Sequence, residues 1–149
     1  MEENGEIIAS IFYAVAKIKG DAESEVLTFG PVSVKPCYQK KGYGEKMINF
    51  TLSKAKDLGY AAVIITGNPD YYKKYGFVAC KNYDIYYDGM DKNEAAPFFM
   101  IKVLDENKIA AIKGVYKDPD CYLVDENEAE AFDKKFPNKE KLKTDTQIF

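Results

Sequence analysis

The sequence predicts a mixed α/β domain whose sheet is largely antiparallel and contains one parallel strand pair. Two apolar segments rich in β-branched residues flank a polar turn within residues 7–34, which predicts an antiparallel hairpin. A helical pattern over residues 44–58 leads into an uninterrupted apolar run over residues 61–66. A strand, a helix and a second strand in this order form a crossover, and crossovers join parallel strands.

Length and composition fit one domain. The chain has 149 residues, of which 46% are hydrophobic, enough to bury a core. All 21 basic residues are lysines, and 24 acidic residues leave a net charge of −3. This balance excludes a broad electrostatic attraction to nucleic acid. The sequence has no histidine, and Cys37, Cys80 and Cys121 are widely spaced, so it predicts neither a metal site nor a disulfide framework.

Three unpaired cysteines fit a reducing compartment, so we expect a cytoplasmic protein. The most apolar stretch, residues 7–18, is interrupted by Ser10 and Lys17 and is shorter than the roughly 20 residues that a membrane helix needs. The residues before it are acidic, whereas a secretory signal starts with basic residues. We expect no membrane association.

The hairpin is predicted from strands over residues 7–18 and 26–34, joined by a polar turn over residues 19–25. The pair Gly30-Pro31 lies inside the second strand. Because proline cannot donate a hydrogen bond to the neighbouring strand, this pair predicts a kink or bulge.

In the crossover helix, Ile48, Leu52 and Ala55 recur on one face, as in an amphipathic helix that packs on a sheet. Gly59 is suited to end the helix. The apolar run over residues 61–66 is typical of a strand covered on both faces, so we expect this strand to be central.

Weaker signals follow the crossover. One or two helical turns are predicted over residues 70–75, and strands over residues 77–87 and 97–104. Residues 109–116 and 121–124 are candidate strands, and Asp125 with Glu128 resembles the capping box of a final helix. We therefore divide the chain into a core over residues 1–104 and an extension over residues 105–149, which we expect to pack on the core.

The segment from Gln39 to Gly44 places a glycine-containing turn between a strand and the start of a helix. The first N–H groups of a helix lack internal partners, and the helix dipole adds partial positive charge there. Glycines let an anion approach the backbone closely, and Lys40 and Lys41 add cations. The segment predicts a site for a cofactor that carries a pyrophosphate. The plain alternatives are a tight turn at the two glycines and a solvated lysine pair.

Two familiar phosphate loops do not fit. A Walker loop ends in Gly-Lys-Ser or Gly-Lys-Thr, and a dinucleotide fingerprint needs a third glycine, whereas Glu45-Lys46-Met47 follows Gly44. The pattern Gln39-x-x-Gly42-x-Gly44 after Val34-x-Pro36 instead resembles the acyl-coenzyme A signature of the GNAT N-acetyltransferase superfamily. The segment Tyr72-Lys73-Lys74-Tyr75-Gly76-Phe77 is similar to a second motif of that superfamily, Tyr-x-x-x-Gly-Phe.

The resemblance covers roughly residues 7–104, and the segment Gly67-Asn68-Pro69-Asp70-Tyr71-Tyr72 is similar to that of a bacterial, largely uncharacterised branch. It implies a GNAT-like fold with a splayed parallel strand pair and flanking helices. It also implies an acyltransferase that moves an acetyl group from acetyl-coenzyme A to a primary amine of a small molecule or peptide. The amine attacks directly in a ternary complex, and no cysteine occupies a nucleophile position, Cys37 being the nearest.

The resemblance assigns roles to individual residues. The backbone N–H of Val34 would face the thioester carbonyl and stabilise the charge that grows on it. Tyr72 would protonate the departing thiolate. Asn68 would contact the pantetheine arm, although a turn-forming role is the plain alternative. The implied cofactor-binding set is Val32, Ser33, Val34, Gln39, Lys40, Lys41, Gly42, Tyr43, Gly44 and Asn68.

The sequence also departs from the superfamily. Many relatives have a strand and two helices before the hairpin, whereas six residues precede Ile7. Either the chain is a truncated form, or its tail or a second subunit covers the exposed sheet edge, which makes a homodimer one expectation. No carboxylate lies in residues 61–66 to act as general base, so water or Asp70 would take that role.

Two alternatives to catalysis stay open. One is a non-catalytic module that binds acyl-coenzyme A as a sensor, and the other is an interaction subunit with an incomplete acceptor site. The acidic residues Asp84, Asp88, Asp91 and Glu94 either attract a cationic acceptor or form a solvated loop.

Overall fold

The computed structural model describes residues 1–20, 22–138 and 140. They fall into two compact units, Met1–Asp118 and a second one that begins at Pro119, and each is described by itself. The first unit holds strands β1 (Glu2–Glu3), β2 (Glu6–Ile7), β3 (Ala9–Lys19), β4 (Glu23–Val34), β5 (Ala62–Thr66), β6 (Val78–Ala79), β7 (Ile85–Tyr87), β8 (Phe99–Val103) and β9 (Gly114–Lys117). Its helices are η1 (Pro36–Tyr38), α1 (Tyr43–Asp57), α2 (Pro69–Tyr72), η2 (Lys73–Tyr75), η3 (Cys80–Tyr83) and α3 (Glu106–Ile109).

Seven strands form one mixed sheet in the order β6-β8-β5-β4-β3-β9-β7. Strands β3 and β4 pair antiparallel over most of their length, which confirms the predicted hairpin. Strands β4 and β5 are parallel on either side of α1, as the crossover predicts. A second parallel pair, β7 with β9, corrects the expectation of a single one. These short strands come from distant segments, so the local pattern carries no sign of their pairing.

The hairpin contains the bulge that Gly30-Pro31 predicts. Ile11 lies opposite Val32, whereas Tyr13 lies opposite Phe29, so two residues of β4 face one residue of β3. A bulge bends the strand and increases its twist. The end of β4 therefore changes direction shortly before the turn into α1.

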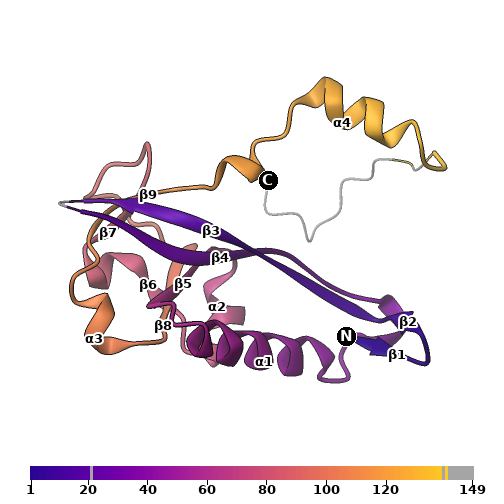
Figure 1. Cartoon of the computed structure of the whole chain (residues 1–149), viewed down its shortest axis with the longest axis horizontal. Coiled ribbons are helices and arrows are strands. Elements are labelled where there is room, and N and C mark those ends of the chain that lie inside the picture. Colours follow the sequence, from indigo (N-terminus) through magenta and orange to yellow (C-terminus); the bar gives the residue numbers. More distant parts are fainter. Residues whose placement is uncertain (21, 139, 141–149) are drawn as a thin grey trace. The chain divides into compact units, whose positions relative to one another are not determined.

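Two apolar clusters cover the two faces of the sheet. On one face, Ile48, Leu52 and Ala55 of α1 pack against Val63 and Ile65 of β5, and Figure 1 shows α1 lying along the sheet. The other cluster includes Ile64, Ile101 and Tyr116. Residues Ala62 to Ile65 are nearly inaccessible, which confirms β5 as a central strand. Each fully buried aliphatic side chain contributes roughly 1.5–3 kcal/mol.

The segment after β5 differs from the prediction of one strand over residues 77–87. It consists of β6, then η3, then β7. Asp84 adopts a left-handed conformation, with φ 55°, at the end of η3. The chain therefore turns there, and β7 pairs with β9 instead of continuing beside β8.

The structure after β8 differs in part from the prediction. Of the predicted strand over residues 109–116, Ile109 is the last residue of α3, whose start is capped by the Asp105 carboxylate, and only the part from Gly114 onward is a strand, β9. Strand β9 pairs with Lys17–Lys19 of β3, so the first unit extends to Asp118. Among the described residues, Ala9–Ala16 of β3 pairs with β4 alone.

The second unit contains η4 (Asp120–Tyr122) and α4 (Glu126–Asp133). Residues 121–124 form no strand, and Leu123 and Val124 are largely exposed. The Asp125 carboxylate accepts hydrogen bonds from the N–H groups of Asn127 and Glu128, which confirms the predicted cap of α4. Residues 139 and 141–149 of the predicted extension lie outside the described residues. No helix in the described part of the chain is long and apolar enough to cross a bilayer.

Candidate functional site

The turn into α1 leaves the first N–H groups of the helix uncapped. Lys40 and Gly42 both adopt left-handed conformations, with φ 58° and 84°. Helix α1 begins at Tyr43, and no side chain caps it at Gly42. The N–H of Lys46 bonds to the Gly42 carbonyl at 3.0 Å, so the N–H groups of the preceding three residues have no partner within the helix. They and the helix dipole favour an anion at this end.

A side-chain hydrogen bond fastens this turn to the end of β4. The Gln39 side-chain Nε2 donates to the Val34 carbonyl at 2.9 Å. A Cβ added at Gly44 would lie 3.6 Å from Val34 Cγ2 and 3.7 Å from the Tyr71 hydroxyl. The first turn of α1, the last residue of β4 and Tyr71 therefore meet at one place.

The backbone of β4 alternates between facing β3 and facing away from it. The N–H of Lys35 donates to the Ile8 carbonyl at 2.8 Å. Val34, opposite Ala9 in the register, is thus a non-hydrogen-bonded position, because bonded and non-bonded positions alternate in an antiparallel ladder. The N–H groups of Val34 and Val32 point away from β3, on the side that faces β5.

Ser33, between Val32 and Val34, is a hydrogen-bonded position of the ladder. Its backbone groups face β3, and its hydroxyl lies 2.8 Å from that of Ser10. Ser33 and Val34 also line a cavity of about 260 Å³ together with residues 7–10. Ser33 is therefore the one member of the predicted Val32–Val34 set whose backbone is not directed toward β5.

Strands β4 and β5 separate after two residue pairs. Leu27 lies opposite Val63 and Thr28 opposite Ile64, and the parallel pairing ends there. Further along β5, Ile65 and Thr66 pair with β8. The β4 bulge follows directly after Phe29. Hence the outward N–H groups of Val32 and Val34 lie beyond the point where the two strands part.

Tyr72 lies half-buried in an aromatic cluster. Its ring centroid is 5.7 Å from that of Phe77 and 6.0 Å from that of Phe29. A Cβ at Gly67 would lie only 2.8 Å from Tyr72 Cε2, so the ring packs directly on this glycine. Burial raises the pKa of the Tyr72 phenol, which keeps its proton at neutral pH.

The Tyr72 hydroxyl has no hydrogen-bond partner among the described residues. It is not one of the inaccessible polar atoms, since no such atom in this part of the chain lacks a partner. Its oxygen therefore remains open to solvent or a ligand. Tyr71 differs, because its hydroxyl accepts a hydrogen bond of 3.3 Å from Tyr75. Spacing to Gly76-Phe77 selects Tyr72 in the sequence, and its role as the acid stays a prediction.

Asn68 caps the short helix α2. Its Oδ1 accepts a hydrogen bond from the N–H of Asp70 at 2.9 Å, and its carbonyl accepts from Tyr71 and Tyr72. This cap holds the start of α2, the helix that contains Tyr71 and Tyr72, shortly after the end of β5. A contact between Asn68 and a cofactor stays a prediction.

Lysine side chains surround the start of α1. The Lys41 ammonium lies 5.8 Å from the Tyr38 ring centroid, and that of Lys46 lies 5.8 Å from the Tyr43 ring centroid. The Lys74 ammonium is 4.7 Å from the Tyr71 ring centroid and 3.9 Å from a carboxylate oxygen of Glu45. Lys40 and Lys41 are exposed. Together these cations can offset the charge of a bound phosphate.

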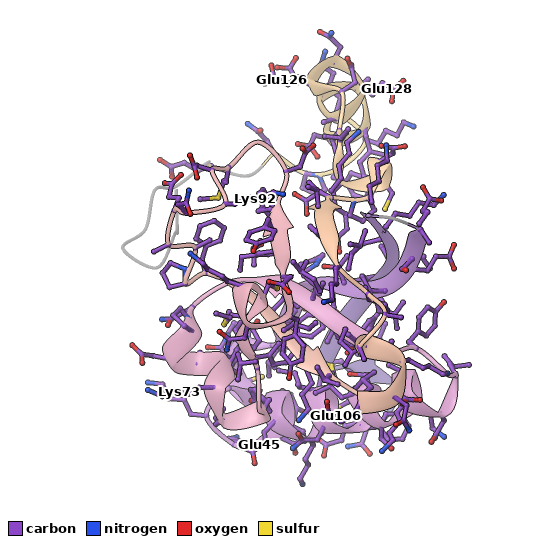
Figure 2. All side chains as sticks on the ribbon, turned by 90° about the vertical axis from the view of Figure 1, so that its left-hand side faces the viewer. Glu45, Lys73, Lys92, Glu106, Glu126 and Glu128 are labelled. Carbon is purple, nitrogen blue, oxygen red and sulfur yellow. The ribbon has the colours of Figure 1, made fainter. Side chains whose placement is uncertain are left out.

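Asp70 is poorly suited to act as general base. Its carboxylate is exposed and accepts a hydrogen bond from the Lys73 ammonium at 2.6 Å. This hydrogen bond lowers the pKa of Asp70, which makes it a weaker base. Figure 2 labels Lys73 and Glu45 on the same side of the first unit.

The sequence did not single out two residues of this site. One is Tyr71, which is the neighbour of Tyr72 and whose hydroxyl lies next to Gly44. Gly67 carries no motif of its own, and the ring of Tyr72 requires it. A glycine directly after a buried strand is the one sequence signal that pointed to such a close approach.

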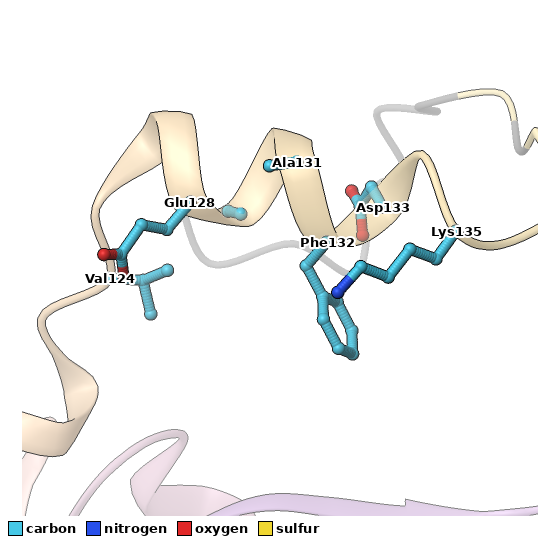
Figure 3. A pocket seen from close by; sticks show the side chains of 7 residues that line it. Val124, Glu128, Ala131, Phe132, Asp133 and Lys135 are labelled. Atoms are coloured by element: carbon cyan, nitrogen blue, oxygen red, sulfur yellow. The ribbon is translucent and has the colours of Figure 1, made fainter.

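Other parts of the chain offer less chemistry. A hollow of about 530 Å³ lies along α4 and is lined by Val124, Ala129, Phe132 and their neighbours (Figure 3). It is formed within the second unit and includes none of the predicted site residues. No group of three or more potential metal-ligating side chains occurs in the described residues.

Comparison with known proteins identifies the family. The profile described as "Acetyltransferase (GNAT) domain" matches residues 1–79. The chain belongs to the GNAT acetyltransferase family. The match covers β3, β4, α1 and β5, and with them the whole predicted site.

Two relatives from Escherichia coli strain K12 are N-acetyltransferases named as uncharacterised. YhbS is 23% identical over 84 residues, which is 56% of this chain and 50% of the relative. YjhQ is 27% identical over 95 residues, which is 63% of this chain and 48% of the relative. The chain thus spans about half the length of the curated relatives it matches.

Solved structures share the GNAT fold. The crystal structure of Escherichia coli YhbS in complex with CoA aligns with a TM-score of 0.70 and 18% identity, covering 81% of this chain and 65% of that one. A GNAT acetyltransferase from Brucella melitensis in complex with acetyl-CoA aligns with a TM-score of 0.60 and 24% identity, covering 81% and 64%. The mixed sheet with flanking helices is therefore the GNAT fold.

Proposed function

We propose that this chain transfers an acetyl group from acetyl-coenzyme A to a primary amine by direct attack in a ternary complex. The observation that carries the proposal is the direction of the Val34 N–H. It points away from β3 beyond the place where β4 and β5 part, beside the uncapped start of α1. A thioester laid along this opening would have its carbonyl oxygen within reach of that N–H.

The start of α1 supplies the cofactor site in this proposal. The N–H groups of Tyr43 and Gly44 bind the diphosphate of coenzyme A, with Lys40 and Lys41 adding charge. Gln39 acts through its side-chain bond to Val34, which holds the turn in register with the strand. The binding of CoA and acetyl-CoA by the GNAT proteins of similar fold supports this assignment.

The chemical step uses two groups of this chain. The neutral amine attacks the thioester carbonyl carbon, a C–N bond forms, and the Val34 N–H stabilises the oxyanion. The C–S bond then breaks, the thiolate takes the proton of the Tyr72 hydroxyl, and the nitrogen loses its extra proton to water. Tyr72 recovers its proton from solvent. Water is the proposed acceptor because Asp70 is exposed and paired with Lys73.

A paired assay tests the function. Calorimetry measures acetyl-coenzyme A binding, and thiol release measures transfer to a panel of primary amines. The proposal expects stoichiometric binding and amine-dependent thiol release. Binding without release on any amine would favour a non-catalytic acyl-coenzyme A sensor, and absence of binding would favour an interaction subunit.

Two further expectations belong to this proposal. The cytoplasm is the compartment that fits three free cysteines. The outer edge of β3 over residues 10–16, which pairs with no second strand among the described residues, fits pairing with another copy, because an open strand edge favours the addition of another strand. Light scattering of the full chain measures whether a homodimer forms.

A further inference from the structure

Another cavity lies on the opposite face of the sheet from α1, between β7, β8 and the loop that joins them. Its volume is about 280 Å³. The lining residues that matter here are Ile85, Tyr86, Tyr87, Asp91, Glu94 and Phe99. None of the residues proposed above to bind coenzyme A contributes to it.

The floor of this cavity is rigid and apolar. Ile85 and Phe99 belong to the buried core, with 1% and 2% of their surface exposed. The ring centroids of Tyr87 and Phe99 are 5.2 Å apart, and the Tyr87 hydroxyl donates to the Asp118 carboxylate. Burial raises the pKa of Tyr87 to about 12. The cavity therefore offers neutral aromatic walls whose orientation is fixed.

The rim of the cavity is acidic. Asp91 and Glu94 line it, and with Lys81 they give the lining a net charge of −1, two carboxylates against one ammonium. Asp84 and Asp88, which the sequence grouped with them, do not line the cavity. Asp84 instead forms an ion pair of 3.7 Å with Lys113. The structure thus separates this acidic group into two cavity residues and two others.

One lining ring, that of Tyr86, already contacts an ammonium group of the chain, although Lys92, which carries that group, does not line the cavity. The Lys92 ammonium lies 5.3 Å from the centroid of the Tyr86 ring, and Figure 2 labels Lys92 well away from Lys73 and Glu45. A cation over the face of a tyrosine is attracted by the ring electrons. The lining therefore combines the two features that recognise an organic ammonium, namely aromatic faces and carboxylates.

One wall of the cavity lies beside the end of β5. Phe99 lies opposite Thr66, the last residue of β5. The N–H of Gly67 donates to the Phe98 carbonyl at 2.9 Å. The Phe99 wall of the cavity is thus one strand away from β5, at the end of β5 that lies beyond its pairing with β4.

The volume limits the size of the ligand. One water molecule occupies about 30 Å³ in the liquid, so a cavity of about 280 Å³ holds roughly nine non-hydrogen atoms. That size fits a small amine with one ring or a short branched chain. A nucleotide or a long polyamine would not be enclosed.

We propose that this cavity binds the acceptor, and that the acceptor is a small primary amine with an aromatic or branched apolar body. This inference rests on the proposed function. The apolar body lies on Phe99 and Tyr87, and Asp91 and Glu94 attract the ammonium form. The amine loses a proton to water before it attacks.

Binding of a defined probe, phenethylamine, tests the proposal without requiring turnover. Calorimetry of the full chain saturated with coenzyme A measures the binding affinity for phenethylamine. The control compounds are 2-phenylethanol, which carries no charge, and n-propylamine, which has no ring. The expected result is saturable one-to-one binding of phenethylamine, about tenfold tighter than either control compound. Equal or absent binding of all three compounds would overturn the proposal.

Matched variants locate the binding. The double variant Asp91→Asn/Glu94→Gln is expected to weaken phenethylamine binding about tenfold while coenzyme A binding stays unchanged. Asp84→Asn is the control, because it removes a nearby carboxylate outside the cavity and asparagine tolerates the left-handed backbone there. Equal affinity in the double variant and the wild type would contradict the assignment.

The two proposals fail in different ways. Coenzyme A binding without phenethylamine binding overturns the acceptor cavity and leaves the cofactor site intact. Absence of coenzyme A binding overturns the proposed function and the acceptor role together. Circular dichroism of each variant confirms that it folds like the wild type.

Discussion

The Gln39 side-chain amide donates a hydrogen bond of 2.9 Å to the Val34 carbonyl and so joins the turn before α1 to the end of β4. The bond couples the two halves of the proposed cofactor site, which are the uncapped helix start and the outward N–H groups of β4. An amide side chain suits this position because its NH₂ group can donate while the turn backbone stays free.

Replacing Gln39 with alanine is expected to weaken coenzyme A binding by about three- to tenfold, since a single net hydrogen bond contributes roughly 1 kcal/mol. Calorimetry of coenzyme A binding measures the effect. Ser33→Ala is the control, because the Ser33 hydroxyl faces Ser10, and we expect unchanged affinity. An equal loss in both variants would show that the bond to Val34 has no specific role.

Gly42 and Gly89 form a matched pair of left-handed glycines. Their φ angles are 84° and 79°, and a Cβ at either would meet nothing within 4 Å. Alanine at either position is expected to cost about 1–2 kcal/mol of folding free energy from backbone strain alone. Only Gly42→Ala should also weaken coenzyme A binding. Urea unfolding and calorimetry separate the two effects, and a binding loss in Gly89→Ala would refute this distinction.

Tyr72→Phe is expected to lower kcat by about a hundredfold while the affinity for acetyl-coenzyme A stays unchanged, as for the loss of a general acid. Tyr71→Phe, the neighbouring control, should keep most of the activity. Because burial raises the pKa of Tyr72 above its ordinary value of 10.0, the acid remains protonated through neutral pH. Steady-state rates from pH 6 to 9 should show no loss caused by this group, and unchanged turnover in Tyr72→Phe would exclude its role.

Cys80 gives the fold a dependence on alkaline pH. Burial raises the pKa of its thiol above the ordinary value of 9.0. As the pH rises, the unfolded chain therefore loses the Cys80 proton before the folded chain does. The contribution of the protonated thiol to folding stability is complete below about pH 9 and is lost as the pH rises further. The free energy of unfolding in urea should fall between pH 8 and 10.5. Cys80→Ala should show a shallower fall, and an identical slope would contradict the assignment.

The sequence predicts the part of the fold in which local pattern and tertiary environment agree. Ile48, Leu52 and Ala55 mark the buried face of α1, and the apolar run of β5 reflects its cover on both faces. Gly30-Pro31 predicts the bulge because of the missing donor of proline. These signals depend on residues close together in the chain.

The errors arise where distant segments decide the structure. Residues 77–87 are apolar enough for one strand. However, η3 ends at Asp84, which has a left-handed backbone conformation, and β7 then pairs with β9 at the far edge of the sheet. Leu123 and Val124 have the composition of a strand but no pairing partner among the described residues, and both are exposed. Pairing across such a separation has no local signature.

In the candidate site, too, local features could be predicted and features that depend on distant segments could not. The glycine turn and the tyrosine motif are readable because each has a fixed spacing. The contact between Gly67 and the Tyr72 ring depends on how α2 returns to β5. The separation of Asp91 and Glu94 from Asp84 and Asp88 depends on the course of the loop between β7 and β8. Spacing alone could not supply either feature.

Whether coenzyme A binds along β4 and the start of α1 is tested by titrating the isotope-labelled chain with coenzyme A and following the amide signal of each residue by nuclear magnetic resonance. We predict that the largest shifts occur at the amides of Val32, Val34, Tyr43 and Gly44, with small shifts at Ser33. Saturable binding whose shifts lie elsewhere, or no binding at millimolar coenzyme A, would contradict it.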